Sequence, residues 1–325
     1  MSSFPETRLR RLRRTESLRR MLGQPVPTLG KMIWPVFVVE GENRKTEIAS
    51  MPGQFRMSRD ELCRELEPLV DQGLGGVMLF GVVDSDLKGR EPYLFYDNGL
   101  IRRTIRMVKR SYPNLLVFTD VCLCGVTGNG HCGVMKNGVV DNDATLSQLI
   151  EIARVHAHVG ADGVAPSAMM DGQVAAIRRM LEDNGYTDTI LMSYSTKFAS
   201  ALYGPFREAA ESSPQCGDRK AYQLPPDHLQ QALRESQVDE QEGADILMVK
   251  PATFYLDVIS KIREQTLLPL AAYNVSGEYA MLHALAKSGG GDLMALAREN
   301  LTAIQRAGAD ILITYWANQY DRIFK

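Results

Sequence analysis

Two lysines end successive apolar segments of the sequence. Leu191–Thr196 runs directly into Lys197, and Ile246–Val249 runs into Lys250. Burial at a strand end disfavours an ammonium, and a second ammonium nearby lowers its pKa further. An amine freed in this way attacks a ketone and forms a Schiff base. If the segments are neighbouring strands, the two lysines predict Schiff-base chemistry; surface or salt-bridged lysines are the alternative.

Three clustered cysteines predict a metal site. Cys122, Cys124 and Cys132 fall within eleven residues, around a glycine-rich turn. Three thiolates match zinc whose fourth position stays open for water or substrate, as catalytic zinc requires. His131 is adjacent to Cys132, where ring geometry makes joint ligation awkward. Buried or redox-active cysteines are the alternative.

The segment from Tyr203 to Gln223 predicts a lid. It combines glycine and proline with aromatic side chains and three cations, Arg207, Arg219 and Lys220. Loops of this kind close over substrates, and the cations favour an anionic one. A solvated loop is the alternative.

Eight short apolar segments alternate with helical patterns and predict the elements that position these side chains. The segments are Met32–Val39, Gly76–Val82, Leu115–Asp120, Gly163–Pro166, Thr189–Ser193, Asp245–Lys250, Leu270–Asn274 and Asp310–Thr314. Strands that are apolar throughout are typical of parallel sheets covered on both faces. Eight β-then-α units predict a (β/α)8 TIM barrel, with chemistry at the carboxyl ends of the strands. A flavodoxin-like doubly wound sheet is the weaker alternative.

Two further features concern the ends of the predicted strands. The tripeptide Gly-Ala-Asp occurs at 160–162, 243–245 and 308–310, each time closing a helix and opening a strand. A glycine there serves as the helix C-cap, so the tripeptide predicts one repeating α-to-β turn. Three hydroxyl side chains that could hold a carboxylate or an amine lie at or beyond the ends of the last two strands: Tyr273, Ser276 and Tyr315. Core or surface tyrosines and a serine in a solvated turn are the alternatives.

The composition excludes several classes of protein. Lys and Arg number 37 against 39 Asp and Glu, a net charge of −2, so no global positive field recruits nucleic acid or anionic membrane. The most apolar stretch is far shorter than the roughly 20 residues that span a bilayer. The arginines near the N-terminus precede no apolar signal region. Five cysteines, an odd and clustered set, favour a reducing compartment, and we expect the cytoplasm.

Residues 1–28 predict an N-terminal arm, and residues 29–325 a single catalytic barrel. The arm is basic, with seven arginines from Arg8 to Arg20 that include Arg13 and Arg14. Because no aromatic residues interleave with the arginines, we expect packing on a neighbouring subunit rather than nucleic-acid binding.

Several motifs resemble the porphobilinogen synthase family, also called 5-aminolevulinate dehydratase. They are SYSTKFAS from Ser193, YGPFREA from Tyr203, MVKPA from Met248, YNVSGEY from Tyr273, and the three cysteines. The resemblance covers nearly the whole chain, and these motifs are long and specific.

The resemblance implies a zinc-dependent condensation of two 5-aminolevulinate molecules to porphobilinogen, with loss of two waters, in tetrapyrrole (heme) biosynthesis. Lys250 would form the Schiff base with one substrate, called the P-side substrate. Lys197 would form that with the other, A-side substrate, or assist as a charged neighbour. Zinc on the three cysteines would lie near the A-side amine, as a Lewis acid or a source of hydroxide.

The resemblance also implies the residues that hold the substrates. Near the P-side amine lie Asp120 and Ser167, and at the P-side carboxylate Ser276 and Tyr315. The lid residues at the A-side carboxylate are Arg207, Arg219 and Gln223. The pocket walls are Tyr203, Phe206 and Tyr273.

Assembly and a second metal follow from the same resemblance. It implies a homo-octamer whose arms embrace neighbours. Glu235 matches an acidic residue of an allosteric magnesium site at a subunit interface in many members; a solvated glutamate is the alternative. Two positions depart from the family pattern. Lys220 stands where arginine is common, and Thr253-Phe254 where smaller or aliphatic residues are frequent, which raises the question of packing beside Lys250.

Without the resemblance, other functions compete. A class I aldolase also uses a strand-end lysine in a barrel, but has no need of zinc, so the cysteine cluster discriminates against it. A nucleic-acid-binding protein and a catalytically silent homologue are further alternatives, disfavoured by the net charge and by the intact lysines, cysteines and lid.

Overall fold

Eight parallel strands close into a barrel in the computed structural model, which describes residues 4–83, 88–89 and 99–325. They are β1 (Met32–Val38), β4 (Gly76–Gly81), β5 (Leu116–Val121), β8 (Gly163–Pro166), β9 (Ile190–Lys197), β10 (Ile246–Lys250), β11 (Leu270–Asn274) and β12 (Ile311–Thr314). Each pairs with the next in chain order, and β12 pairs with β1 to close the sheet. The predicted (β/α)8 barrel is confirmed, and β9 alone runs well beyond its predicted end.

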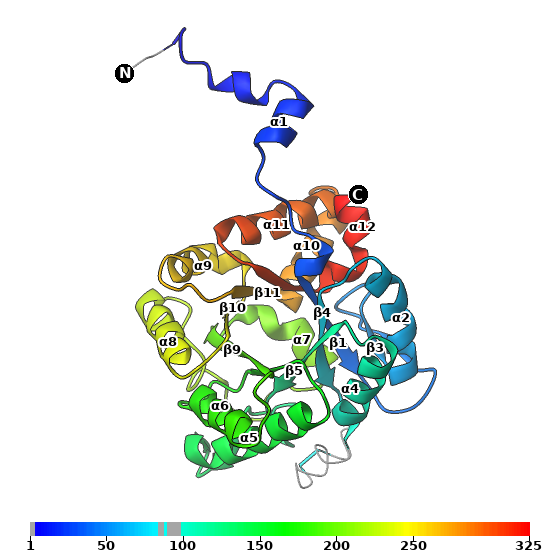
Figure 1. Cartoon of the computed structure of the whole chain (residues 1–325), viewed down its shortest axis with the longest axis vertical. Helices are drawn as coiled ribbons and strands as arrows, with labels where there is room; N and C mark the ends of the chain where they lie inside the picture. The colour runs from blue at the N-terminus through cyan, green and yellow to red at the C-terminus, as the bar shows by residue number, and fades with distance from the viewer. Residues whose placement is uncertain (1–3, 84–87, 90–98) are drawn as a thin grey trace.

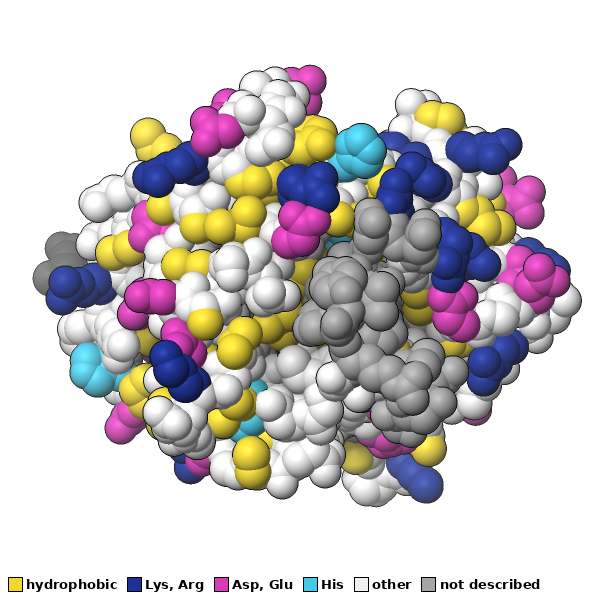
Figure 2. Space-filling model, turned by 90° about the horizontal axis from the view of Figure 1, so that it is seen from below, with side chains coloured by type: hydrophobic (Ala, Val, Ile, Leu, Met, Phe, Trp, Pro, Cys, Tyr) yellow, Lys and Arg dark blue, Asp and Glu magenta, His cyan; other side chains and the backbone are white. Residues whose placement is uncertain are grey.

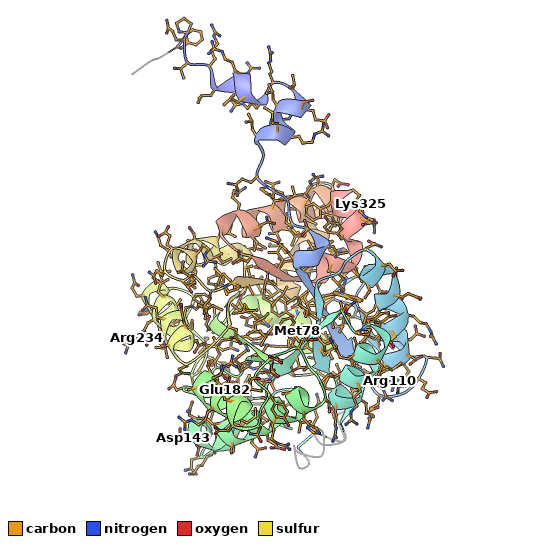
Figure 3. The ribbon with its side chains drawn as sticks, in the orientation of Figure 1. Met78, Arg110, Asp143, Glu182, Arg234 and Lys325 are labelled. Carbon is orange, nitrogen blue, oxygen red and sulfur yellow. The ribbon has the colours of Figure 1, made fainter. Side chains whose placement is uncertain are left out.

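Helices surround the barrel (Figure 1). The main ones are α2 (Arg59–Asp71), α4 (Leu100–Ser111), α5 (Asn142–His158), α6 (Gln173–Asp183), α8 (Leu229–Gln241), α9 (Leu256–Arg263), α10 (Ser276–Lys287) and α11 (Leu293–Ala307). Shorter pieces are η2 (Leu29–Lys31), η4 (Ala201–Tyr203), α7 (Gly204–Ala209), η5 (Thr253–Tyr255), η6 (Tyr315–Gln319) and α12 (Tyr320–Phe324). Met78 of β4 is fully buried and lies near the centre of the ring in Figure 3, whereas Arg110, Glu182 and Arg234 lie at its rim. The core therefore fills the barrel and the layer between strands and helices.

Two short hairpins were not predicted. β2 (Lys45–Glu47) and β3 (Phe55–Met57) pair antiparallel, and β3 adds to the edge of β1; β6 (Val134–Lys136) and β7 (Val139–Asp141) form a separate pair. Three-residue strands are too short to show a period. The second hairpin did carry a signal, since Asn137 and Gly138 between its strands both have positive φ, 53° and 81°. Asn-Gly is the preferred pair for such a turn.

The Gly-Ala-Asp tripeptide forms the same turn three times. Its glycine has positive φ each time. Its aspartate forms two hydrogen bonds with the backbone at the start of the preceding strand. In the first copy, the Asp162 N–H donates to the carbonyl of Val117 (3.0 Å), and the Asp162 carboxylate accepts from the N–H of Val117 (2.8 Å). Asp245 with Leu191 and Asp310 with Leu270 repeat both bonds.

Each of these carboxylates also forms an ion pair with a cation. The cation lies on the helix that precedes the hydrogen-bonded strand. The pairs are Lys109–Asp162, Arg178–Asp245 and Arg263–Asp310. The recurrence therefore joins two strands and a helix at the amino ends of the barrel strands, opposite to the predicted chemistry.

The segment before the barrel contains η1 (Leu9–Arg13) and α1 (Glu16–Leu22), neither of which has a buried residue. Figure 1 shows it leading away from the barrel. Its contact with a neighbouring subunit stays a prediction. The face seen in Figure 2 mixes cationic and anionic side chains with hydrophobic ones. Within the described residues, no helix combines the length and apolar character needed to cross a membrane.

Replacing Asp162 by alanine should destabilise the barrel without disturbing its carboxyl ends. The change leaves the Val117 N–H without its acceptor, and the free energy of unfolding should fall by about 1–3 kcal/mol. Asp162→Asn keeps an acceptor and loses only the ion pair, so its loss should be smaller. Urea unfolding of both variants measures the free energy of unfolding. Equal stability of Asp162→Ala and wild type would contradict a stabilising role for the Asp162–Val117 hydrogen bonds.

Candidate active site

Lys250 ends β10 inside a cage of aromatic rings. Its Nζ lies 4.0 Å from the ring centroid of Tyr273, 4.9 Å from Tyr194, 5.1 Å from Phe206 and 5.6 Å from Tyr203. The side chain is buried. Ring faces attract an ammonium, but they replace only part of the hydration that burial removes.

The surroundings of Lys250 favour its neutral form. Burial, and after it the neighbouring charge of Lys197, lower the pKa of Lys250 to about 7, although Asp120 acts in the opposite direction. Near neutral pH a large fraction of this amine is therefore unprotonated and nucleophilic.

A β-bulge brings Lys197 to the same place. Ser193 pairs with Leu247 and Thr196 pairs with Val249, so β9 has one more residue than β10 over this stretch. The Ser195 hydroxyl fills the gap in the ladder, accepting from the N–H of Met248 (3.3 Å) and donating to its carbonyl (3.4 Å).

Such a bulge re-aims the side chains that follow it. Tyr194 and Lys197 are three positions apart, which puts them on opposite faces of a regular strand. Here the Lys197 Nζ lies 5.5 Å from the Tyr194 ring centroid, and that ring also contacts Lys250. The bulge therefore allows both lysines to share one pocket.

Asp120 and Ser167 complete the charged part of the pocket. Asp120 lies on β5, and burial raises its pKa, while a hydrogen bond with Ser167 opposes the rise. The Lys197 ammonium donates to the carbonyl of Ser167. Two lysine amines thus lie near one carboxylate, so the pocket is electrostatically balanced when one amine is neutral.

The three predicted cysteines come together after β5. Their sulfurs all lie within 4.8 Å of one another, and those of Cys122 and Cys124 are 3.4 Å apart. Sulfurs bound to one tetrahedral zinc at 2.3 Å lie about 3.8 Å apart. All three are buried and none forms a disulfide. Among the described residues this is the only group of three metal-binding side chains, and its geometry and donor type fit zinc.

The protons of this cluster are unequally held. Hydrogen bonds with Cys124 and Cys132 raise the pKa of Cys122 well above its ordinary value. Hydrogen bonds from Cys122 and Cys124 lower the pKa of Cys132, so Cys132 is the first of the three thiols to lose its proton as pH rises. The His131 ring faces away, with one nitrogen 3.1 Å from the Tyr222 hydroxyl and the other 2.9 Å from the Cys216 carbonyl.

The lid residues present unused donors. Arg207 Nε, Arg219 Nε and Gln223 Nε2 are buried and have no hydrogen-bond partner in the described part of the chain. Burial lowers the pKa of Arg207, and the nearby Arg219 lowers it further. Two neighbouring cations with unsatisfied donors favour an anion between them. Lys220 is exposed and pairs with Asp218 at 3.6 Å.

Arg219 also ties the lid to the cysteine loop. Its Nη2 donates to the carbonyls of Gly130 (2.8 Å) and Ser212 (2.7 Å). Gly130 has a φ of 69°, and a Cβ there would lie 2.4 Å from the Ser213 carbonyl oxygen. Only glycine permits this approach of the two loops.

The remaining predicted residues close the pocket from β11 and β12. The Tyr273 and Tyr315 hydroxyls are 3.2 Å apart. The Ser276 Oγ accepts from the N–H of Phe206 at 2.9 Å. The Tyr203 hydroxyl lies 2.8 Å from the carbonyl of Phe198 and 3.3 Å from that of Lys250, and by donating there it holds the backbone at the ends of β9 and β10.

Two predicted features lie elsewhere. Phe254 is 62% exposed, so it does not pack beside Lys250. Glu235 is on α8, in a groove of about 490 Å³ that Asp171 and Asp239 also line, outside the lysine pocket. Burial raises the pKa of Glu235, and Asp171 raises it further.

Sequence reasoning missed Tyr194. Its ring contacts both lysines, and its buried hydroxyl has no hydrogen-bond partner among the described residues. A tyrosine within an apolar strand is usually part of the core, and without the bulge it could not be assigned to the lysine face.

The family model described as delta-aminolevulinic acid dehydratase matches residues 6–323. The chain belongs to the delta-aminolevulinic acid dehydratase family. It is therefore an enzyme of the dehydratase, or lyase, class, as the sequence predicted.

Individual members of the delta-aminolevulinic acid dehydratase family are similar to this chain over nearly their full length. The chain is 49% identical to the enzyme of Methanothermobacter thermautotrophicus over 317 residues, 97% of this chain and 96% of that one. It is 46% identical to the Escherichia coli enzyme over 311 residues, 95% of each. The Toxoplasma gondii enzyme, also named porphobilinogen synthase and solved with its reaction product porphobilinogen, has a TM-score of 0.94 and 42% identity. That match covers 97% of this chain and 91% of the other.

The reactivity of Lys250 should follow a low pKa. Because the pKa is lowered to about 7, the neutral amine appears as pH rises through 7 rather than above 10. Modification by a small amine-directed reagent, followed at the Lys250 peptide by mass spectrometry, measures the midpoint. Lys197→Met removes the like charge and should move that midpoint to higher pH. A wild-type midpoint near 10 would contradict the assignment.

Proposed function

We propose that this chain condenses two molecules of 5-aminolevulinate to porphobilinogen with loss of two waters, in tetrapyrrole biosynthesis. The observation that carries the proposal is the meeting of two lysines, one with a strongly lowered pKa, beside a cluster of three thiols in one pocket. The product named in the Toxoplasma gondii structure supports it.

On the P side, Lys250 is the nucleophile. Its neutral amine attacks the ketone of the first substrate, and loss of water leaves a Schiff base. The aromatic cage excludes water from the adduct. Asp120 and Ser167 hold the amine of this substrate, and the hydroxyls of Ser276 and Tyr315 bind its carboxylate.

On the A side, the lid binds the second substrate. Arg207, Arg219 and Gln223 direct their unpartnered donors to its carboxylate. Lys197 forms the second Schiff base or acts as the charged neighbour of Lys250. Cys122, Cys124 and Cys132 hold zinc, which when bound supplies a Lewis acid near the A-side amine.

The class I aldolase alternative explains only part of this site. An aldolase needs the strand-end lysine, but neither the second lysine nor the three buried thiols. The two-Schiff-base reaction uses all of them.

Assembly and regulation belong to the same proposal. We infer a homo-octamer in the cytoplasm, with residues 1–28 contacting a neighbour. We assign Glu235 to an allosteric magnesium site. The three thiols are the only metal-binding group of three within the described chain, so the remaining magnesium ligands are waters or come from a second subunit.

Zinc should be required for turnover. Chelation should abolish porphobilinogen formation from 5-aminolevulinate and added zinc should restore it, because the thiols fit that metal. Cys132→Ser should purify with little zinc and stay inactive when zinc is added. A further gain with magnesium, lost in Glu235→Gln, would support the second site.

Two results would oppose the zinc assignment. One is full activity in a chain shown by metal analysis to be free of zinc. The other is a Cys132→Ser variant that keeps both its zinc and its rate.

A further inference from the structure

The proposed A side depends on α7, a helix of six residues that carries Phe206 and Arg207. In the view of Figure 1, α7 lies across the centre of the ring of strands. The Phe206 ring belongs to the Lys250 cage, and Arg207 carries an unpartnered buried donor. Helices this short are marginal on their own hydrogen bonds. Contacts from other elements must therefore determine where Arg207 lies.

The amino end of α7 is held by α10. The Ser276 hydroxyl accepts from the Phe206 N–H, and Gly277 packs so closely on η4 that a Cβ would lie 2.4 Å from the carbonyl oxygen of Leu202. These contacts belong to the site already described.

The carboxyl end of α7 is held by Arg56, from the unpredicted hairpin strand β3. Its Nε donates to the carbonyl of Ala209 (2.8 Å) and its Nη2 to that of Glu208 (2.5 Å). Carbonyls of a last helical turn run out of intrahelical donors, and a cation is favourable there. No carboxylate within the described residues forms an ion pair with Arg56, so its guanidinium serves α7 alone.

The same contact extends to the second lid arginine. The chain leaves α7 through Glu211, whose φ is 48° and whose carbonyl accepts from Lys88. The next residue, Ser212, is buried and its carbonyl accepts from Arg219 at 2.7 Å. A shift of the carboxyl end of α7 would therefore move Arg207 directly and Arg219 through two residues.

We propose that Arg56 is a positioning residue for the A side: by fixing the carboxyl end of α7 it places Arg207 and Arg219 for the carboxylate of the second substrate. This inference rests on the proposed function and deepens it. Arg56 touches neither lysine, and it holds the carboxyl end of α7, whereas Phe206 of the Lys250 cage is held at the amino end by Ser276. Its loss should therefore affect the lid more than the P-side Schiff base. It is only partly buried, on a hairpin outside the ring of barrel strands, so its loss should leave the barrel folded.

Steady-state kinetics test the proposal with a matched control. Arg56→Met should raise KM for 5-aminolevulinate about tenfold and change kcat by less than about threefold, because misplaced lid arginines weaken the binding of the second substrate. Arg56→Lys should fall between, since an ammonium lacks the fork that reaches both carbonyls. Arg44→Met is the control, because Arg44 precedes β2 in the same extension and its side chain bonds the Glu40 carbonyl instead. An unchanged KM in Arg56→Met, or the same change in Arg44→Met, would overturn the assignment.

Limited trypsin digestion gives a readout that needs no reaction. Cleavage after Arg207 should be faster in Arg56→Met than in wild type or Arg44→Met, because the end of α7 frays when it loses the hydrogen bonds from Arg56. Equal cleavage rates in the two variants would contradict the claim that Arg56 holds the carboxyl end of α7. If wild type makes no porphobilinogen, the proposed function fails, and the digestion still decides the role of Arg56.

Discussion

Two lysine amines and one carboxylate share a pocket lined by aromatic rings. The rest of the site depends on this excess of cationic groups over carboxylates. Asp120 is the one carboxylate among the described residues whose charge acts on both lysines, and it can neutralise only one ammonium. Burial and repulsion therefore act together on Lys250, whose pKa falls to about 7. A nucleophilic amine at neutral pH is thus a consequence of the architecture.

The barrel supplies this arrangement by joining elements from distant parts of the chain. The Ser195 bulge turns Lys197 toward Lys250, the Tyr203 hydroxyl holds the Lys250 backbone, and Arg219 connects the lid to the cysteine loop. At the opposite end, the three Gly-Ala-Asp clasps join strands to helices without contacting the pocket. Stability and chemistry are separated along the barrel axis, as in other barrels of this type.

The fold could be predicted because its strands are apolar throughout and bounded by glycine turns, so all eight appear in the sequence. The unpredicted parts depend on tertiary contacts. The pattern of residues 189–197 does not show that β9 contains a bulge, and so Tyr194 was not assigned to the site. Phe55–Met57 is too short to show the alternation of apolar and polar residues that identifies a strand. Nothing in the sequence therefore indicated a role for Arg56. The tripeptide predicted a turn from its glycine, whereas the role of its aspartate needs the neighbouring strand. The roles of the substrate-binding residues came from family motifs, because spacing alone cannot show which side chains meet.

Borohydride trapping tests the central claim most directly. The protein is incubated with 5-aminolevulinate at neutral pH and reduced, and the modified peptide is identified by mass spectrometry. The account predicts a substrate adduct on Lys250 that forms readily near pH 7 and is absent in Lys250→Met. Adduct formation on other lysines with Lys250 unmodified, or no adduct in a chain that makes porphobilinogen, would contradict it.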